Sequence, residues 1–392
     1  MTIMKEVVIV DGVRTPNGRA HGKKGWFRNH TPDELLTAVY DALFARNQQV
    51  KPESVDAVFI GTAVQAGLTF DIGRLGWLAG GYPDTVPTNT ICQQCPSGMA
   101  AVEHAARAIM CNEADIMVAG GCEDMYKIPM GYGVDYPPRL LEKYGDSLSM
   151  GATAEKVAEQ WNISKKDMIN MAYFSHKNAA AARDAGKFSP EIVPIEGETE
   201  EGEKFMVNQD QWINDQISIE AMEGMKTPFK ENGVISAALS SPLTTGACAL
   251  LLMSREKADE LGCEYHLKYK AGVMAGCDPT IMGIGPIPAV QKLLAKTGLT
   301  ADDIGVVEIN EAFASQALAC LRDLGLEENA PFKKTNLWGG ALALGHPLGE
   351  SGARVIITLS NIMKTERPDA KYGLATLCGG FGNGNAILLE RV

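Results

Sequence analysis

The sequence predicts an α/β protein made of two similar halves with largely parallel sheets. Short β-branched segments such as residues 6–11 and 55–60 alternate with segments of helical pattern, the order expected of strands joined by helices. An internal repeat accompanies this alternation. With 392 residues, the chain is long enough for two or three packed units.

The first elements have clear local signals. Residues 6–11 read Glu-Val-Val-Ile-Val-Asp, which predicts a buried strand. Thr31 and Pro32 predict the start of a helix, as its N-cap and first helical residue. A second buried strand is expected at 55–60.

The repeat is a glycine-marked loop, a helix, a strand and a double-glycine turn, in that order. In the first half, a helix over 97–110 precedes a strand at 116–119 and the pair Gly120-Gly121. In the second half, a helix over 351–363 precedes a strand at 373–377 and the pair Gly379-Gly380. The shared order of four features indicates duplication.

The segment between the repeats has a different character. We expect helices near 153–160 and 165–185, and a solvated loop at the acidic stretch 196–203. The chain is therefore divided into an N-terminal half (1–120 plus 241–270), an inserted loop domain (121–240) and a C-terminal half (271–392).

Composition excludes several classes of function. The net charge of −12 argues against nucleic acid or an anionic membrane as partner. Nine cysteines, an odd number, fit reduced thiols better than a disulfide framework. Neither a signal-peptide pattern nor an apolar run of ~20 residues is present, so a cytoplasmic protein is expected.

Cys95 is the first candidate for chemistry. It precedes Pro96 and a run of helix formers, and the amino terminus of a helix lowers the pKa of a thiol and offers N–H groups to an oxyanion. A buried structural cysteine is the plainer alternative, and a metal or redox pair with Cys92 is another. Because no second cysteine pair stands at zinc spacing, we expect no metal site.

Two further candidates lie in the second repeat. His346 sits in a glycine-rich loop before the repeated helix, so it could face Cys95 across a pseudo-twofold axis and act as its base; a structural histidine is the alternative. Cys378 stands where the repeated strand ends, as catalytic groups do in α/β sheets. Its thiol could act as an acid or base beside glycine amides that form an oxyanion hole.

The segment Asn310-Glu311-Ala312-Phe313 follows a strand expected at 305–309. Its plain interpretation is a helix cap in which the macrodipole favours Glu311. The apolar residues after it suit core packing.

Together these segments resemble the signature stretches of the thiolase family. The matching stretches are Cys95-Pro-Ser-Gly, Asn310-Glu-Ala-Phe, Gly345-His-Pro and Cys378-x-Gly-x-Gly, in order and along essentially the whole chain. The resemblance implies a five-layer α-β-α-β-α arrangement with an inserted loop domain that holds coenzyme A. It further implies that CoA is a substrate, that no other cofactor is needed, and that the chain forms a homodimer or homotetramer, with a small accessory subunit in some relatives.

The resemblance also implies roles for individual residues. Cys95 would take the acyl group as a thioester, His346 would activate it, and Cys378 would move a proton at the thiol or the α-carbon. One oxyanion hole would use His346 and a water held by Asn310, and the other the amides of Cys95 and Gly380. The residues expected to line the CoA arm or acyl pocket are Met150, Phe229, Ala237, Ser241 and Phe313.

Departures from the family pattern cluster around the substrate. Ser149 replaces a histidine, Leu239 replaces a small polar residue, and Phe381 stands in a loop of small residues. Trp212, in a segment that lacks the usual Arg-Pro pair, is expected to take over stacking on the adenine.

We therefore expect a degradative thiolase for a larger or unusual 3-oxoacyl-CoA, aromatic or dicarboxylic, of which benzoylsuccinyl-CoA is an example. The alternatives are an acetoacetyl-CoA-forming biosynthetic thiolase, a decarboxylating ketoacyl synthase of the same fold and a non-catalytic CoA-binding subunit.

Overall fold

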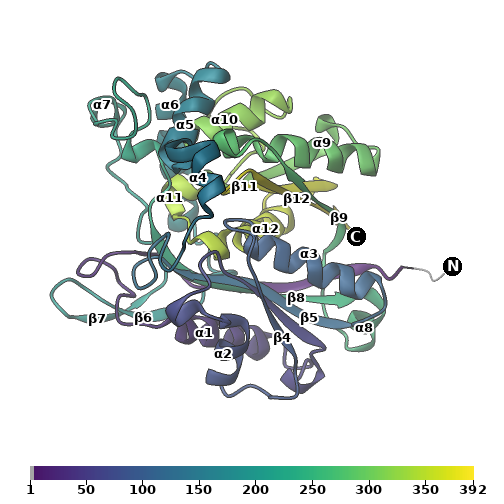
Figure 1. Cartoon of the computed structure of the whole chain (residues 1–392). Helices are drawn as coiled ribbons and strands as arrows, with labels where there is room; N and C mark the ends of the chain where they lie inside the picture. Colours follow the sequence, from purple (N-terminus) through teal and green to yellow (C-terminus); the bar gives the residue numbers. More distant parts are fainter. Residues whose placement is uncertain (1–3) are drawn as a thin grey trace.

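The computed structural model describes residues 4–392 and has five layers. Two half-sheets enclose a central helical layer of α3 and α12, α1 and α2 cover one outer face, and α5, α6, α9 and α10 cover the other (Figure 1). The helices are α1 Pro32–Arg46, α2 Ile72–Ala79, α3 Ser97–Met110, α4 Pro138–Tyr144, α5 Met150–Gln160, α6 Lys165–Asp184, α7 Ile219–Glu223, α8 Arg255–Glu260, α9 Pro286–Thr297, α10 Ala314–Asp323, α11 Ala341–Leu344 and α12 Leu348–Thr365. The predicted five-layer α/β fold is confirmed.

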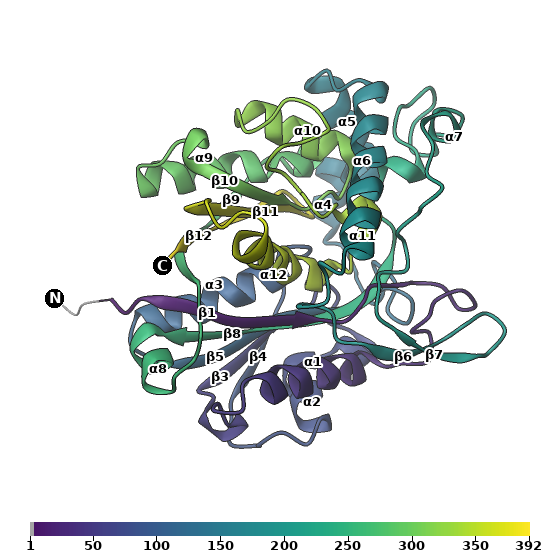
Figure 2. The same cartoon turned by 180° about the vertical axis from the view of Figure 1, so that it is seen from behind.

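The two halves repeat one strand order. The main sheet runs β10-β11-β12-β9-β1-β8-β5-β3-β4. In both halves a parallel pair (β3–β5 and β10–β11) is followed by antiparallel pairs, and the first half adds β4 in parallel at its edge. A short pairing of β1 with β9 joins them, visible from behind in Figure 2. The strands are β1 Val7–Arg14, β2 Gly18–Arg19, β3 Ala57–Gly61, β4 Thr88–Ile91, β5 Ile116–Asp124, β6 Ile195–Glu198, β7 Lys204–Val207, β8 Thr244–Ser254, β9 Leu267–Gly276, β10 Ile304–Ile309, β11 Tyr372–Gly379 and β12 Asn383–Arg391. The repeat predicted from the sequence is therefore present in three dimensions.

The expectation of largely parallel sheets is wrong. Parallel pairing is confined to β3 with β4 and β5, and to β10 with β11, among the described strands. For one of the antiparallel pairs the reason is connectivity: β11 returns directly into β12 through a tight turn, which permits only antiparallel pairing.

The glycine pair of the first repeat is not a turn. Strand β5 continues through Gly120 and Gly121 to Asp124. A Cβ on Gly121 would lie 2.0 Å from the carbonyl oxygen of Gly349 at the start of α12. Glycine is therefore needed here for close packing of the central helix on the strand.

The local expectations near the amino terminus are confirmed. Helix α1 begins at Pro32 with Thr31 as N-cap, and the side chain of Glu34 completes a capping box. The first strand runs Val7–Arg14, three residues longer than its expected end. Strand β9 crosses the domain boundary placed at residue 270 and pairs mainly with β12; the division into three units stays a prediction.

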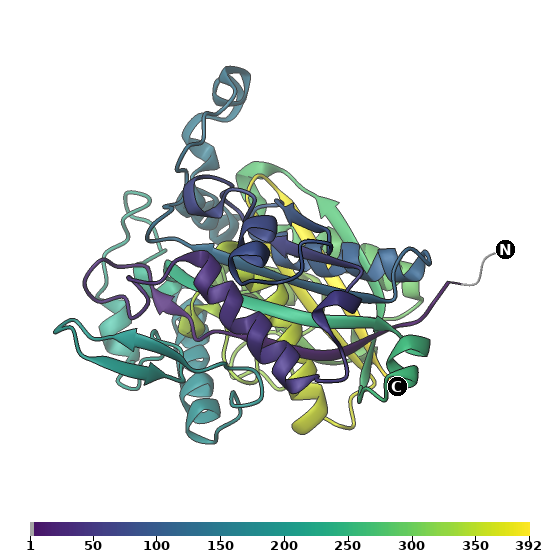
Figure 3. The same cartoon turned by 90° about the horizontal axis from the view of Figure 1, so that it is seen from below.

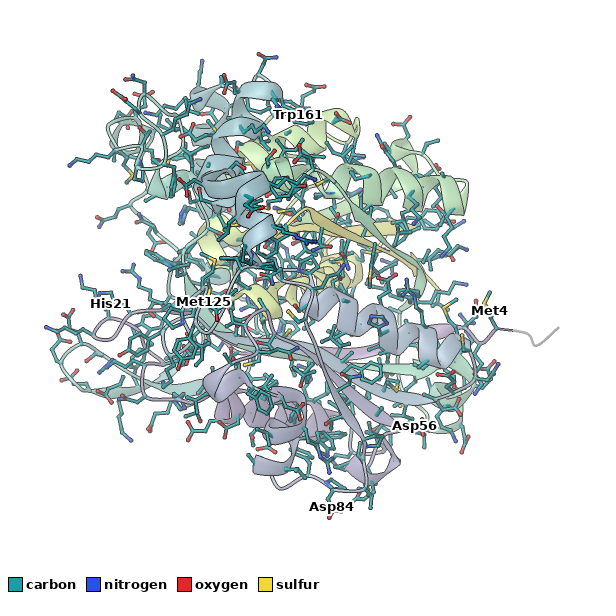
Figure 4. All side chains as sticks on the ribbon, in the orientation of Figure 1. Met4, His21, Asp56, Asp84, Met125 and Trp161 are labelled. Carbon is teal, nitrogen blue, oxygen red and sulfur yellow. The ribbon has the colours of Figure 1, made fainter. Side chains whose placement is uncertain are left out.

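The inserted segment packs helices on the second half. Helices α5 and α6 lie beside α10, and Figure 4 shows Trp161, after α5, at the far end from Asp84. Residues around α4 project from the body (Figure 3). The acidic stretch is not a simple loop, because its arms pair as the hairpin β6–β7 and Arg28 binds Glu198. Within residues 4–392, every helix is too short or too polar to cross a membrane.

Candidate active site

Cys95 lies in a short loop between β4 and α3. The helix begins at Ser97, as predicted, with Pro96 as N-cap. The loop turns sharply because Gln94 has a left-handed φ of 59°. Cys95 is buried, with 8% of its surface exposed.

The turn between β11 and β12 brings backbone donors to the Cys95 sulfur. The N–H groups of Gly380 and of Cys95 itself favour the thiolate and so lower the pKa of Cys95. Gly379 packs on Pro96 so closely that a Cβ there would lie 2.4 Å from the proline ring. The two loops are thus held in contact at the start of the helix.

Cys378 lies in β11, two residues before Gly380, and is fully buried. Burial, and after it the neighbouring charge of the Cys95 thiolate, raise the pKa of Cys378 well above its usual value. A neutral thiol beside Cys95 can give a proton to a carbanion. Both cysteines are free, as is the exposed Cys92, and no group of three potential metal ligands was found among the described residues.

His346 precedes α12, and its ring is fixed from two sides. The Asn310 Nδ2 atom lies 3.3 Å from Nε2, and the Ser351 Oγ atom lies 2.7 Å from Nδ1. The Ser351 hydroxyl also donates to the Pro347 carbonyl oxygen at 2.8 Å. Because amide nitrogen only donates, Nε2 is the acceptor, Nδ1 carries the proton, and Ser351 accepts it. This tautomer presents Nε2 as a base.

Glu123 ties the two halves of the site together. Its carboxylate accepts N–H groups from Ala63 (2.7 Å), Val64 (3.3 Å) and Gly349 (2.8 Å), and the Thr62 hydroxyl at 3.2 Å. Gly349 is in the first turn of α12, directly after the His346 loop. The sequence did not point to Glu123, because the strand that carries it was expected to end at Ala119.

Burial dominates the protonation states. Desolvation raises the pKa of Cys95 to about 11, although the two N–H groups lower it. Desolvation likewise lowers the pKa of His346 to about 3, helped by the positive charge of Arg354. The pKa of Cys95 therefore does not follow the expected lowering by the helix terminus, because burial has the larger effect.

Glu311 does not act as the expected helix cap. Helix α10 starts only at Ala314, and Glu311 is buried, accepting from Ser175 (2.7 Å), Asn336 (2.7 Å) and the N–H of Leu342 (3.1 Å). It anchors the segment that carries Asn310. Three donors from distant segments explain why a buried carboxylate is tolerated.

The residues expected to line the CoA arm come together beside this segment. The N–H of Ser241 donates to the Ala312 carbonyl oxygen at 2.9 Å, and Phe313 contacts Phe229 edge-on with ring centroids 6.5 Å apart. The Phe229 ring also packs on Gly151, next to Met150 at the start of α5, and Ala237 begins the short turn before Ser241. Their roles toward CoA stay predictions.

Trp212 makes a cation–π contact. The guanidinium of Arg19 sits over its ring, 3.9 Å from the centroid. One ring face is therefore covered by a cation, and the stacking of Trp212 on the adenine stays a prediction.

Comparisons with known proteins agree on one family. A family model described as "Thiolase, N-terminal domain" matches residues 7–256, and "Thiolase, C-terminal domain" matches residues 264–391. A 3-ketoacyl-CoA thiolase of Vibrio vulnificus is 43% identical over 392 residues, covering 99% of this chain and 100% of its own. One of Pseudoalteromonas translucida is 42% identical over 393 residues, with the same coverage.

Solved structures give the same result. The acetyl-CoA acetyltransferase of Bacillus anthracis superposes with a TM-score of 0.89 at 35% identity, and human mitochondrial 3-ketoacyl-CoA thiolase with 0.89 at 32%. Each pair is covered over 100% of both chains.

Proposed function

Because the chain belongs to the thiolase family and is an acyltransferase, we propose that it catalyses CoA-dependent thiolysis of a 3-oxoacyl-CoA. We further propose that the preferred acyl chain is larger than that of acetoacetyl-CoA and carries an aromatic ring. The observation that carries the reaction is the close packing of the turn at Gly379 and Gly380 on the Cys95 loop, where a Cβ on Gly379 would lie 2.4 Å from the Pro96 ring. CoA serves as substrate, and the proposed reaction needs no further cofactor.

The first half-reaction transfers the acyl group to the enzyme. His346 Nε2 takes the proton of Cys95, and the thiolate attacks the 3-oxo carbon. The bond between that carbon and the α-carbon then breaks, its electron pair passes to the α-carbon, and Cys378 protonates it to release acetyl-CoA. An oxyanion held between His346 and a water on Asn310 stabilises the attack.

The second half-reaction regenerates the free enzyme. The Cys378 thiolate takes the proton of CoA–SH, and the CoA sulfur attacks the acyl-cysteine carbonyl, whose oxygen lies at the N–H groups of Cys95 and Gly380. The acyl group leaves as acyl-CoA, and the Cys95 sulfur recovers its proton from His346. Every proton is back in place, and the reverse sequence is a Claisen condensation.

An aromatic pair beside the catalytic turn supports the aromatic acyl chain. Phe381 lies between Gly380 and Gly382 with a left-handed φ of 63°, a conformation that costs a bulky residue about 1–2 kcal/mol. Its ring contacts Tyr136 of the inserted segment edge-on, with centroids 5.9 Å apart, and both rings are partly exposed. A strained, exposed ring one residue from an oxyanion donor suits contact with a flat substrate.

The test is thiolysis of a substrate panel with product analysis of the acyl-CoAs. The panel runs from acetoacetyl-CoA through long-chain and dicarboxylic to aromatic 3-oxoacyl-CoAs, with Cys95→Ala as the control. Highest kcat/KM on an aromatic substrate, abolished by the control, supports the proposal. Highest kcat/KM on acetoacetyl-CoA would refute the acyl preference, and no turnover on any substrate would refute the reaction.

We also propose that the chain works as a homodimer or homotetramer. Sedimentation of the purified chain measures the assembly. Activity that appears only after a small companion protein is added would indicate an accessory subunit.

A further inference from the structure

A buried carboxylate, Glu350, stands directly behind the candidate base. It lies in the first turn of α12, four residues after His346, and is fully buried. Its Oε2 atom is 3.4 Å from Ser351 Oγ, the same oxygen that lies 2.7 Å from His346 Nδ1. Its Oε1 atom has no hydrogen-bond partner in the described structure. A buried carboxyl oxygen without a partner is costly, so its presence here calls for a role.

The surroundings of Glu350 hold other charges. Arg354 stands one turn further along α12, and all three of its guanidinium nitrogens lack a partner in the described residues. The positive charges of Arg354 and Arg14 favour the ionised carboxylate, while burial and the charge of Asp210 oppose it. The opposing effects leave the pKa of Glu350 at about 7. Cys248 of β8 also faces this group, donating its S–H to the Glu350 carbonyl oxygen at 3.5 Å.

The Ser351 hydroxyl has two acceptors within reach, and they differ in charge. In the neutral site it donates to the Pro347 carbonyl oxygen at 2.8 Å. When His346 becomes an imidazolium, its Nδ1–H still donates to Ser351. The hydroxyl can then turn to the Glu350 carboxylate, because an ionised acceptor makes the stronger bond.

We propose that Glu350 is a positioning residue that, through Ser351, stabilises the imidazolium of His346 formed when Cys95 gives up its proton. The inference rests on the proposed role of His346 as the base for Cys95. Only an S–H bond breaks and only an N–H bond forms, because the proton moves from the Sγ atom of Cys95 to the Nε2 atom of His346. The proton on Nδ1 of His346 stays where it is. The negative charge of Glu350 offsets the Arg354 charge that otherwise disfavours the imidazolium.

The experiment follows the ionisation of Cys95 without any acyl-CoA. Wild type, Glu350→Gln and Ser351→Ala are treated with iodoacetamide across a pH series, and alkylation of the Cys95 peptide is measured by mass spectrometry. Both substitutions should move the midpoint of Cys95 alkylation upward by about one pH unit, which is about a tenfold slower reaction at neutral pH. The acid limb of the pH profile of thiolysis should move the same way.

Glu308→Gln is the matched control. Glu308 is also fully buried and faces Arg354, but burial raises its pKa well above its usual value, which disfavours the ionised carboxylate. Its replacement should leave the midpoint unchanged.

Three outcomes would overturn the proposal. They are an unchanged midpoint in folded Glu350→Gln, an unchanged midpoint in Ser351→Ala, and an equal shift in Glu308→Gln. Because alkylation needs no substrate, a shift seen in a protein that turns over no 3-oxoacyl-CoA supports this inference while the proposed reaction fails.

Discussion

Removing the Glu123 carboxylate should separate two effects that it exerts on the site. In Glu123→Gln, the best orientation keeps the amide oxygen on the N–H groups of Ala63 and Gly349, at 2.7 and 2.8 Å in the native protein. The amide nitrogen then faces the N–H of Val64, while the Thr62 hydroxyl can rotate to accept. One buried N–H is left without an acceptor, at about 1–3 kcal/mol.

Glu123→Ala leaves all three N–H groups without an acceptor. The loss should therefore rise to at least about 3 kcal/mol. Urea denaturation at one fixed protein concentration measures both variants, since subunit association would also shift the transition. Glu103→Gln is the control: this buried carboxylate accepts from Arg107, and its other oxygen has no partner, so an amide oxygen can replace it with a loss of at most about 1 kcal/mol.

The negative charge of Glu123 disfavours the Cys95 thiolate, although the hydrogen bonds of the same carboxylate stabilise the fold. Its carboxylate raises the pKa of the Cys95 thiol, so Glu123→Gln should lower the midpoint of Cys95 alkylation while it lowers stability. Glu123 itself has a pKa of about 7 because of burial, so the shift should appear above neutral pH and fade below it. Unchanged stability of Glu123→Ala, or an upward shift in Glu123→Gln, would refute the assigned role.

Three further predictions test the acyl pocket, the acid sensitivity and the buried ion network. Phe381→Ala should lower kcat/KM for an aromatic 3-oxoacyl-CoA by about tenfold, the equivalent of about 1.4 kcal/mol of aromatic contact, with little change on acetoacetyl-CoA. His176 is buried with a pKa of about 4, so between about pH 6.5 and 4 the unfolded state binds a proton that the folded state does not. The free energy of unfolding should therefore fall by about 3 kcal/mol on acidification through that window. In urea titrations, His176→Asn should remove this pH-dependent loss of stability. Arg14→Met should cost about 3–5 kcal/mol in urea, because it leaves Asp210 and Glu191 buried without their cation.

Each of these three predictions has an outcome that would contradict it. Equal losses of Phe381→Ala on both substrates would contradict contact with the acyl ring. If stability depends on pH equally in the wild type and in His176→Asn, the buried neutral imidazole is contradicted, because both proteins would then bind the same number of protons on unfolding. A near-native transition in Arg14→Met would contradict the dependence of both carboxylates on that guanidinium.

What the sequence determined by itself is the set of elements and groups whose signals are local. Thr31, Pro32 and Glu34 mark a helix start within four residues, and a capping box needs nothing from the rest of the chain. The duplicated order of helix and strand is likewise a linear pattern. Cys95, Asn310, His346, Cys378 and Gly380 stand in compact stretches that resemble one family, so they could be named before any fold was known.

Only the tertiary structure decided how those groups are supported and charged. The antiparallel pairing of β5 with β8 joins strands that are more than 100 residues apart in the chain, and Gly121 proved to be a packing contact with a helix more than 200 residues away. Glu123 and Glu350 carry no local signal, because each acts on groups delivered by other segments or by the fold of a loop. Burial, a property of the assembled core, outweighs the helix terminus at Cys95: the pKa of a group depends on its three-dimensional neighbours and its access to water, and neither is written in adjacent residues.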